Sequence, residues 1–534
     1  MNNPYLDKNG PVPCVTEEGI RYLSEIVTDP SGPVYAFKGG NPIVPAAAMA
    51  RLSRSQYDIR MILLDEFAVD PSKASDMASK IVTGFGDDSV SQLICIHIGL
   101  VRISNLATKA VEWGRLQAYL EQSTRYIFFD QKDASGRYLY YTPKNLSEEL
   151  KSHYSGRMTE LFDTYSKMVR ELTEHFRKEH PLETTENRTA WLNSTRSKAC
   201  DAVRSVLPAA TLSNIGLVGS AQAIDRMIMN LMAWNLEEFN CLGEKILEQV
   251  RRVAAPFFER TDLPHRGGAI VKHIKNTRQQ IAKIAENLEL NEYKKRQSLD
   301  PHVELVDFWP ENELDIVTKI LFSAQTCRAS HAQIKTLTHT LTELEKRDIL
   351  NTYIGERGNR RHRPGRAFEK AHYEWEFVGD YGTFRDLQRH RMVDDFEWQR
   401  LTPYYGYSIP TAVSEAGFEA DFRRCYDLSE ELYNKMIEAG YEEEAQYATL
   451  MGHLMRYSFI TNAREAYHLI ELRSGLDGHP GYRKLAKQMH ELGVNVHPTI
   501  FGGMNFLETR EDPTLVRLDS EIATERKLNQ LQNK

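Results

Sequence analysis

Hydrophobic and polar positions repeat along this chain in the same order, in two successive segments. A run with strand-like spacing, residues 93–101 in the first segment and 371–378 in the second, leads into a polar stretch expected to be helical. A long amphipathic helix follows, with apolar residues at intervals of three and four. Its apolar face is predicted to comprise Tyr154, Met158, Leu161, Phe162, Tyr165, Met168, Val169 and Leu172 in the first segment, and Leu432, Tyr433, Met436 and Ile437 in the second.

Further matches follow in both segments. We expect another helix to begin near residues 202–208 in the first segment and near 445–448 in the second. The next matching sites are Ser220-Ala221-Gln222 and Asn462-Ala463-Arg464. Several patterns repeated in order indicate two tandem copies of one domain, each far longer than a solenoid repeat.

The boundaries between the copies are predicted from charge and proline. Residues 1–290 form the first copy with an N-terminal extension, 302–511 the second copy, and 512–534 a charged tail. The charged, helix-like stretch 274–297 ends near Pro301, which marks a linker. Alternation in residues 302–307 then predicts a strand that opens the second copy.

Strand candidates are few in each copy and are grouped between helices. This arrangement favours an α+β fold over a doubly wound sheet, with helix-rich copies that each contain a small, mostly antiparallel sheet. No Gly-x-Gly-x-x-Gly follows a strand, and Gly-x-x-x-x-Gly-Lys-Ser/Thr is absent. The sequence therefore supports neither a Rossmann dinucleotide site nor a P-loop.

Composition narrows the class of protein. The chain has 534 residues, 41% of them hydrophobic and 26% charged, as in globular proteins of two domains. No segment approaches the roughly 20 apolar residues of a membrane span, and residues 1–4 do not resemble a signal peptide. We therefore expect a cytoplasmic protein without membrane association.

Cysteine spacing and net charge exclude further classes. The six cysteines contain no Cys-x-x-Cys pair, so the sequence predicts no metal site and no disulfide framework. The net charge of -7 disfavours a nucleic-acid-binding role. The basic segment 357–366 leaves two alternatives open, a solvated loop or a mobile loop that grips an anion.

Two short clusters are candidates for chemistry. Ser123, Thr124 and Arg125 can clasp a phosphate through two hydroxyls and a guanidinium, or they can end a helix while Arg125 pairs with Glu121. Residues 389–391, Arg-His-Arg, suit a polyanionic cofactor, or they form a solvated basic helix end. The residues by themselves leave both pairs of alternatives open.

In order and spacing, these clusters resemble a known family. Residues 389–391 followed by Glu397 resemble the signature Arg-His-Arg-x-x-Ser-x-Asn-Glu-x-Ser-x-Arg of flavin-dependent thymidylate synthases. Residues 461–473 look like the later Asn-Ala-Arg helix of that family. The first copy resembles a divergent branch through residues 50–53, 86–90, 121–126 and 204–208.

The resemblance implies a specific reaction. Members of this family bind FAD and transfer a one-carbon unit from methylenetetrahydrofolate to the uracil ring of dUMP, while NADPH reduces the flavin. They are homotetramers with sites between subunits. By resemblance, the flavin contacts are Ser53, Arg389, His390, Arg391, Glu397, Asn462 and His468; the nucleotide contacts are Arg115, Glu121, Ser123, Thr124, Arg125 and Arg204; and Arg473 is the catalytic residue that polarises the ring.

Each copy departs from the signature in a different place. Trp113-Gly114 stand at the Arg-His of the family in the first copy, and Gln446 stands at the position of Arg204 in the second. The sequence therefore suggests a composite site in a homodimer that forms a pseudo-tetramer. The alternatives are a catalytically inactive protein that binds flavin or nucleotide or serves as a scaffold, a related pyrimidine nucleotide as substrate, and an RNA-binding protein.

Overall fold

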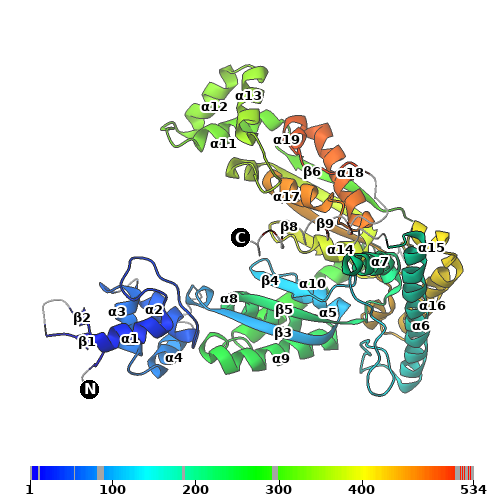
Figure 1. The fold of residues 1–534 in the computed structure, drawn as a ribbon, viewed down its shortest axis with the longest axis horizontal. Helices are drawn as coiled ribbons and strands as arrows, with labels where there is room; N and C mark the ends of the chain where they lie inside the picture. The colour runs from blue at the N-terminus through cyan, green and yellow to red at the C-terminus, as the bar shows by residue number, and fades with distance from the viewer. Residues whose placement is uncertain are drawn as a thin grey trace. The chain divides into compact units, whose positions relative to one another are not determined.

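The computed structural model describes residues 3–9, 13–52, 55–80, 89–182, 187–290 and 299–510, and five positions of the C-terminal tail. The chain divides into two compact units (Figure 1). The first unit contains Met1–Ile103, Ala110–Glu121 and Ser213–Asn291, and the second contains Ser104–Lys109, Gln122–Leu212 and Glu292–Lys534. These units cut across the predicted copies, so part of the first copy belongs to the unit that contains the second. The predicted copy boundaries themselves stay a prediction, and the tail 512–534 lies almost entirely outside the described residues.

The first unit is built around a three-stranded sheet with the order β3-β5-β4. Strand β4 pairs antiparallel with β5, from Gln117 opposite Gly219 to Glu121 opposite Ile215. The main elements are β1 (Leu6–Asp7), β2 (Cys14–Val15), α1 (Glu17–Ile26), α2 (Ile43–Leu52), α3 (Ile59–Ile62), α4 (Ser72–Ser79), β3 (Cys95–Ser104), β4 (Gln117–Glu121), β5 (Leu212–Ser220), α8 (Ala221–Met232), α9 (Glu237–Ala254) and α10 (Gly267–Asn287); α5 (Asn105–Val111) lies at the division between the units.

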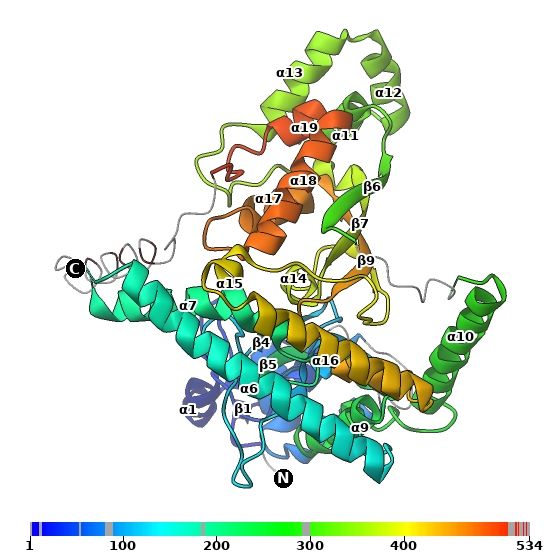
Figure 2. The same ribbon diagram turned by 90° about the vertical axis from the view of Figure 1, so that its right-hand side faces the viewer.

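The second unit contains a four-stranded antiparallel sheet with the order β6-β7-β9-β8. Long helices α6 and α16 lie side by side in this unit (Figure 2). Its elements are α6 (Glu148–Glu179), α7 (Arg188–Val203), β6 (His302–Trp309), α11 (Val317–Phe322), α12 (His331–Thr340), α13 (Glu343–Ile354), β7 (His372–Asp380), α14 (Tyr381–Leu387), β8 (Asp394–Trp398), α15 (Thr411–Glu415), α16 (Glu419–Glu438), β9 (Leu454–Asn462), α17 (Ala463–Arg473), α18 (Pro480–Val496) and α19 (Pro498–Gly502).

The same strand order appears in both sheets. The order β7-β9-β8 of the second sheet corresponds to β3-β5-β4 of the first, and β6 is an additional edge strand. In each copy the central strand leads directly into a helix, β5 into α8 and β9 into α17. The predicted α+β class and the tandem arrangement are therefore confirmed.

Local sequence explains the long helices well. Ser147 caps α6 by accepting a hydrogen bond from the Leu150 amide, and two glutamates occupy the first turn. All eight residues predicted for the apolar face of α6 are buried. In α16, Leu432, Tyr433 and Met436 are buried, as expected. The alternation of buried positions in β7 and β9 places the aromatic core on this sheet, where Phe377 stacks on Tyr457 at 4.9 Å between ring centroids.

Two helix predictions were wrong at the signature segments. Helix α5 ends at Val111, and Glu121 lies on strand β4. Helix α14 ends at Leu387, so residues 389–391 follow it in a turn, and Glu397 lies on β8, opposite Ser458 of β9. The polar runs do not continue as helices, because their later residues pair with a central strand.

The expected helices near residues 202–208 and 445–448 were also wrong. Residues 202 and 203 end α7, and 3₁₀ turns follow at Arg204–Val206 and Glu444–Ala448. Beyond each turn the chain is extended, because Pro208 lacks an amide hydrogen and the following residues form inter-copy hydrogen bonds. Among the described residues, no helix is both long and apolar enough to cross a bilayer.

Candidate functional site

The two copies meet in the second unit through equivalent segments. Pro208 and Leu450 form an isolated antiparallel bridge, and each precedes its central strand by four residues. The Ala209 amide donates to the Thr449 carbonyl at 2.7 Å. Equivalent residues that pair antiparallel indicate a local pseudo-two-fold axis. This junction brings Arg204 of the first copy to α14 of the second.

Asp386 on α14 lies among arginines from both copies. Arg204 Nη1 and Nη2 are each 3.4 Å from Asp386 Oδ2, and Arg473 donates to the Asp386 backbone carbonyl. Burial by itself raises the pKa of this carboxyl, but Arg204, Arg473, Arg389 and Arg125 outweigh burial and hold the pKa well below its usual range. The carboxylate is therefore ionised. Its negative charge interacts with Arg125 and Arg204, which are predicted nucleotide contacts of the first copy, and with Arg389 and Arg473 of the second.

His390 connects Arg473 to a buried glutamate. Arg473 Nε donates to His390 Nε2 at 2.9 Å, and His390 Nδ1 lies 3.1 Å from Glu465 Oε1. Because Nε2 accepts, this network assigns the ring proton to Nδ1, which donates to Glu465. Burial, together with the charge of Arg473, holds the pKa of His390 well below its usual range. A neutral imidazole thus orients the Arg473 guanidinium.

The neighbours of His390 also have shifted pKa values. Burial raises the pKa of Glu465 to about 7, against the opposing effect of Arg363 and Arg464. Burial lowers the pKa of His468 to about 4, and Arg363 acts in the same direction. The ring centroids of His390 and His468 are 5.3 Å apart. The predicted flavin residues thus include two neutral imidazoles at neutral pH.

His390, Glu465 and His468 offer ligand atoms within 4.8 Å of one another, which is a possible metal-binding geometry. His390 Nε2, however, accepts a hydrogen bond from Arg473. The positive charge of Arg363 acts on His468 and Glu465 as well. A divalent cation would meet this positive charge and displace Arg473, so the cluster suits an anionic or polar ligand better than a metal.

Arg125 is held by an internal carboxylate. Its Nε and Nη2 donate to the two oxygens of Asp201 at 2.7 and 2.8 Å, and Nη1 donates to the Tyr482 hydroxyl at 3.0 Å. Burial tends to lower the pKa of Arg125, but Asp201 more than compensates, and the pKa is raised. The partner expected from the sequence, Glu121, is replaced by Asp201 from α7. Arg125 thus fastens the first copy to Tyr482 of the second.

Ser123 and Thr124 have local surroundings. Ser123 Oγ accepts the Arg125 amide at 3.2 Å, as in a serine turn. Thr124 is 3% exposed. The Ser123 hydroxyl of the predicted phosphate clasp is therefore already hydrogen-bonded to the backbone.

The remaining described residues predicted to contact flavin also belong to the second copy. Arg389, Arg391 and Glu397 are exposed. Asn462 caps α17, because its Oδ1 accepts the Glu465 amide at 2.9 Å. The cap places Glu465 in the first turn of α17, from which it reaches His390.

Three predicted residues lie elsewhere. Ser53 is outside the described residues. Arg115 is exposed and Glu121 is 6% exposed, and both belong to the first compact unit. Their roles stay predictions from the resemblance.

The basic segment 357–366 contains two kinds of arginine. Arg357 donates to both oxygens of Glu471 at 2.6 Å, and both side chains are at most 1% exposed. Arg357 is thus a buried anchor and cannot grip a ligand. Arg360 and Arg363 are exposed and lie close enough to His468 to lower its pKa.

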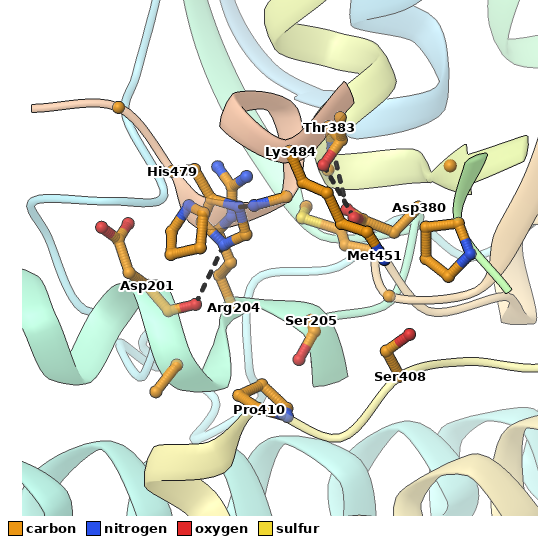
Figure 3. Close-up of a pocket in the computed structure, with 18 of the residues that line it drawn as sticks. Asp201, Arg204, Ser205, Asp380, Thr383, Ser408, Pro410, Met451, His479 and Lys484 are labelled. Carbon is orange, nitrogen blue, oxygen red and sulfur yellow. Dashed lines mark hydrogen bonds between the residues drawn. The ribbon is translucent and has the colours of Figure 1, made fainter. Parts of the chain in front are cut away.

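A pocket of about 1000 Å³ lies within the second unit (Figure 3). Its lining includes Arg125 and Arg204 of the predicted clasp. The opposite walls come from the second copy, at the start of α14 and at the N-terminal end of α18. The pocket is therefore lined by both copies.

Sequence reasoning missed the residues that connect these groups. Asp201, Asp386 and Glu465 matched no expected motif, although each carries a buried or half-buried carboxylate beside a predicted arginine or histidine. Asp386 lies three residues before the Arg-His-Arg run and Glu465 three after Asn462, so proximity to a motif was the only signal. For Lys198 and Lys484, which line the pocket, the sequence contained no such signal.

Comparison with known proteins identifies the class. The family model described as thymidylate synthase complementing protein matches residues 40–256 and 304–499, one segment for each predicted copy. With the duplicated α+β fold, this match defines a thymidylate synthase-like methyltransferase. The chain belongs to the thymidylate synthase complementing protein family.

Relatives match along almost the whole chain. A UPF0159 protein of Chlamydia pneumoniae is 31% identical over 526 residues, which cover 94% of this chain and 97% of that protein. A UPF0159 protein of Thermoplasma acidophilum is 30% identical over 509 residues, covering 89% and 97% of the two chains. The alignments with these two relatives therefore span both predicted copies.

One solved structure also aligns with part of the chain. The UMP/dUMP methylase PolB from Streptomyces cacaoi, bound with 5-Br dUMP, is 18% identical and covers 41% of this chain and 100% of its own. The TM-score is 0.31, which is too low to define the fold.

Proposed function

We propose that this protein transfers a one-carbon unit from methylenetetrahydrofolate to the uracil ring of dUMP or a closely related pyrimidine nucleotide. FAD is the proposed cofactor, NADPH the reductant, and the site is composite. The observation that carries the proposal is the Asp386 cluster, where Arg204 of the first copy meets Arg473 of the second. Family membership supports the reaction class.

The residues around His390 fit a flavin dinucleotide. A diphosphate needs several cations, and exposed Arg389 and Arg391, with Arg360 and Arg363 of the basic segment, offer them. The neutral ring of His390 adds a polar, aromatic neighbour. When bound, the flavin supplies the redox chemistry.

Arg473 is the proposed catalytic residue. A guanidinium beside a ring carbonyl stabilises the negative charge that develops when the uracil ring attacks an electrophile. His390 orients Arg473 through Nε2, and Glu465 keeps the ring proton on Nδ1. Removing one such charge-stabilising donor typically lowers kcat by about 10² to 10³.

The test is FAD reconstitution followed by tritium release from C5 of dUMP, with and without methylenetetrahydrofolate. We expect release that depends on the folate and is reduced by Arg473→Ala. Arg252→Ala, an exposed change in the first unit, is the control and should retain activity. Flavin binding without tritium release would remove the dUMP assignment and retain the flavin site.

A second candidate function is that of a scaffold without catalysis. It is favoured by the bidentate Asp201 contact, which already occupies Arg125. A protein that takes up neither FAD nor dUMP, and stays colourless after reconstitution, would support a scaffold role.

The proposed assembly is a homodimer in which two fused pairs form a pseudo-tetramer. The pairing of Pro208 with Leu450 supports a pseudo-dimer within one chain. Light scattering after gel filtration should give about twice the chain mass of 61.4 kDa. A mass equal to that of one chain contradicts this assembly.

A further inference from the structure

The pocket contains two cations that the predicted clasp does not include. Lys198 on α7 lines the pocket. Lys484 lines it from α18 (Figure 3). Among the described residues, neither ammonium group has a hydrogen bond or ion pair with a carboxylate. Lys198 Nζ lies 4.6 Å from the centroid of the Phe176 ring. The charges of Glu179 and Glu415 act on Lys198 without an ion pair to it. Both lysines are therefore available to an anionic ligand.

The arginines of the clasp are less available. Arg125 satisfies both oxygens of Asp201 and also bonds Tyr482. Arg204 faces Asp386. A phosphate that replaced Asp201 would leave a half-buried carboxylate without its partner, which is destabilising. Arg125 and Arg204 are therefore expected to stay paired with Asp201 and Asp386.

The carboxylates that line the pocket do not cancel the lysines. Asp201 is paired with Arg125. Asp380 caps α14 by accepting the Thr383 amide at 2.8 Å and the Thr383 hydroxyl at 2.7 Å. Asp300 is exposed. Burial, with the nearby charge of Arg204, lowers the pKa of His479 to about 4, so its imidazole is neutral at pH 7.

Hydroxyl groups complete the anion-binding character of the pocket. Ser194 and Ser205 line it, and their Oγ atoms are buried without a hydrogen-bond partner among the described residues. Ser194 is 2% exposed. Pro480 and Gly481 at the N-terminal end of α18 also line the pocket, so the positive end of a 17-residue helix borders it.

We propose that Lys198 and Lys484 hold the phosphate group of the nucleotide, with hydroxyl groups of Ser194 and Ser205, while Arg125 acts as an internal fastener between the copies. The ligand class is a phosphate monoester. This assignment rests on the proposed nucleotide substrate. It differs in that the lysines, and not the arginines, bind the phosphate group.

The experiment compares equilibrium binding of dUMP, deoxyuridine and inorganic phosphate to the full chain by calorimetry. A charge-assisted hydrogen bond contributes enough for Lys198→Met and Lys484→Met each to weaken dUMP binding by about tenfold to hundredfold. Deoxyuridine affinity should not change. Lys487→Met is the matched control, because Lys487 lies one turn further along α18 and donates to backbone carbonyls of Thr509 and Arg510.

Charge-conserving variants separate binding from folding. Lys198→Arg and Lys484→Arg should retain most of the dUMP affinity, while thermal unfolding verifies that the methionine variants are folded. If both methionine variants bind dUMP as the wild type does, the lysine assignment is wrong. The same holds if the wild type binds neither dUMP nor phosphate.

The outcomes also distinguish this assignment from the proposed reaction. Lysine-dependent phosphate binding without dUMP binding would reject the nucleotide and keep the anion site. Lysine-dependent dUMP binding without tritium release would reject methyl transfer alone. Tritium release that is insensitive to both lysines would keep the reaction and reject the lysine site.

Discussion

At the residue scale, a carboxylate lies beside three of the basic side chains of the site, Arg125, Arg204 and His390. Asp201 pairs with Arg125, and Glu465 sets the tautomer of His390. The Asp386 carboxylate lies beside Arg204, while its backbone carbonyl accepts a hydrogen bond from Arg473. Buried charges of this kind strongly destabilise a protein when one partner is removed. Side chains outside the sequence motifs therefore decide what the motif side chains can do.

Glu465 should make stability depend on pH. Burial raises its folded pKa to about 7 from the usual 4.5, so the folded state binds more protons than the unfolded state between these values. This contribution to the unfolding free energy is present below about pH 4.5 and is lost as pH rises through about 7. Glu465→Gln removes it, so urea unfolding at several pH values should show the variant gaining relative to the wild type from about pH 5 to 8. A difference that stays constant with pH contradicts a raised pKa.

Glu471 tests whether Arg357 is an anchor. Glu471→Gln removes the negative charge and leaves the buried Arg357 guanidinium without its ionic partner. We expect a loss of about 3 to 5 kcal/mol in the unfolding free energy. Urea denaturation measures it. The control is Glu343→Gln, whose exposed partner Arg347 lies 3.8 Å away and should matter by less than about 1 kcal/mol. Equal effects of the two variants would show that Arg357 is not an anchor.

At the element scale, the junction between equivalent segments positions the site. The segment before β5 and the segment before β9 pair with each other, and the 3₁₀ turn that carries Arg204 lies at one end of this pairing. Close approach of the two backbones demands small residues there. The Gly452 amide donates to the Ser205 carbonyl at 2.8 Å. The junction is therefore sensitive to added volume.

Gly452→Ala should disturb this junction. A Cβ at Gly452 would lie 2.0 Å from the Tyr426 hydroxyl and 2.7 Å from Ser205 Cβ, which forces one chain segment to move. We expect a loss of about 1 to 3 kcal/mol, measured by urea unfolding. Gly502→Ala is the control, because a Cβ there meets nothing within 4 Å. No difference between the two variants would contradict the close packing of the copies.

At the scale of the whole molecule, duplication allows the two copies to specialise. Only the second copy carries Arg-His-Arg, at residues 389–391, and only the first carries an arginine at the position of Arg204. The second compact unit contains both. One chain therefore has the parts of one composite site.

Flavin stoichiometry should reflect this specialisation. We expect one FAD per chain after reconstitution, because Trp113 and Gly114 replace the Arg-His of the family in the first copy. Flavin absorbance against protein concentration gives the ratio. Two flavins per chain would show that the first copy also retains a cofactor site, and His390→Ala should then remove only one of them.

The sequence alone determined much of the fold, because local spacing and capping are encoded within a few residues. Apolar spacing located α6 and its buried face, alternation located β6 and β7, and the order of repeated patterns revealed the duplication. Helix ends at the signature segments were not determined locally. Pairing of β4 and β8 with central strands overrode the helical pattern.

Only the tertiary structure decided the partners within the site. Arg125 lies beside Asp201 and Tyr482, and His390 beside Glu465 and Arg473, through contacts between residues distant in sequence. Such contacts depend on how each copy folds and, for Arg125 and Tyr482, on how the copies pack, which residue types and spacing do not encode. The two incomplete signatures were visible in the sequence. The fold supplied the reason that their parts can meet, since a segment of the first copy folds into the unit of the second.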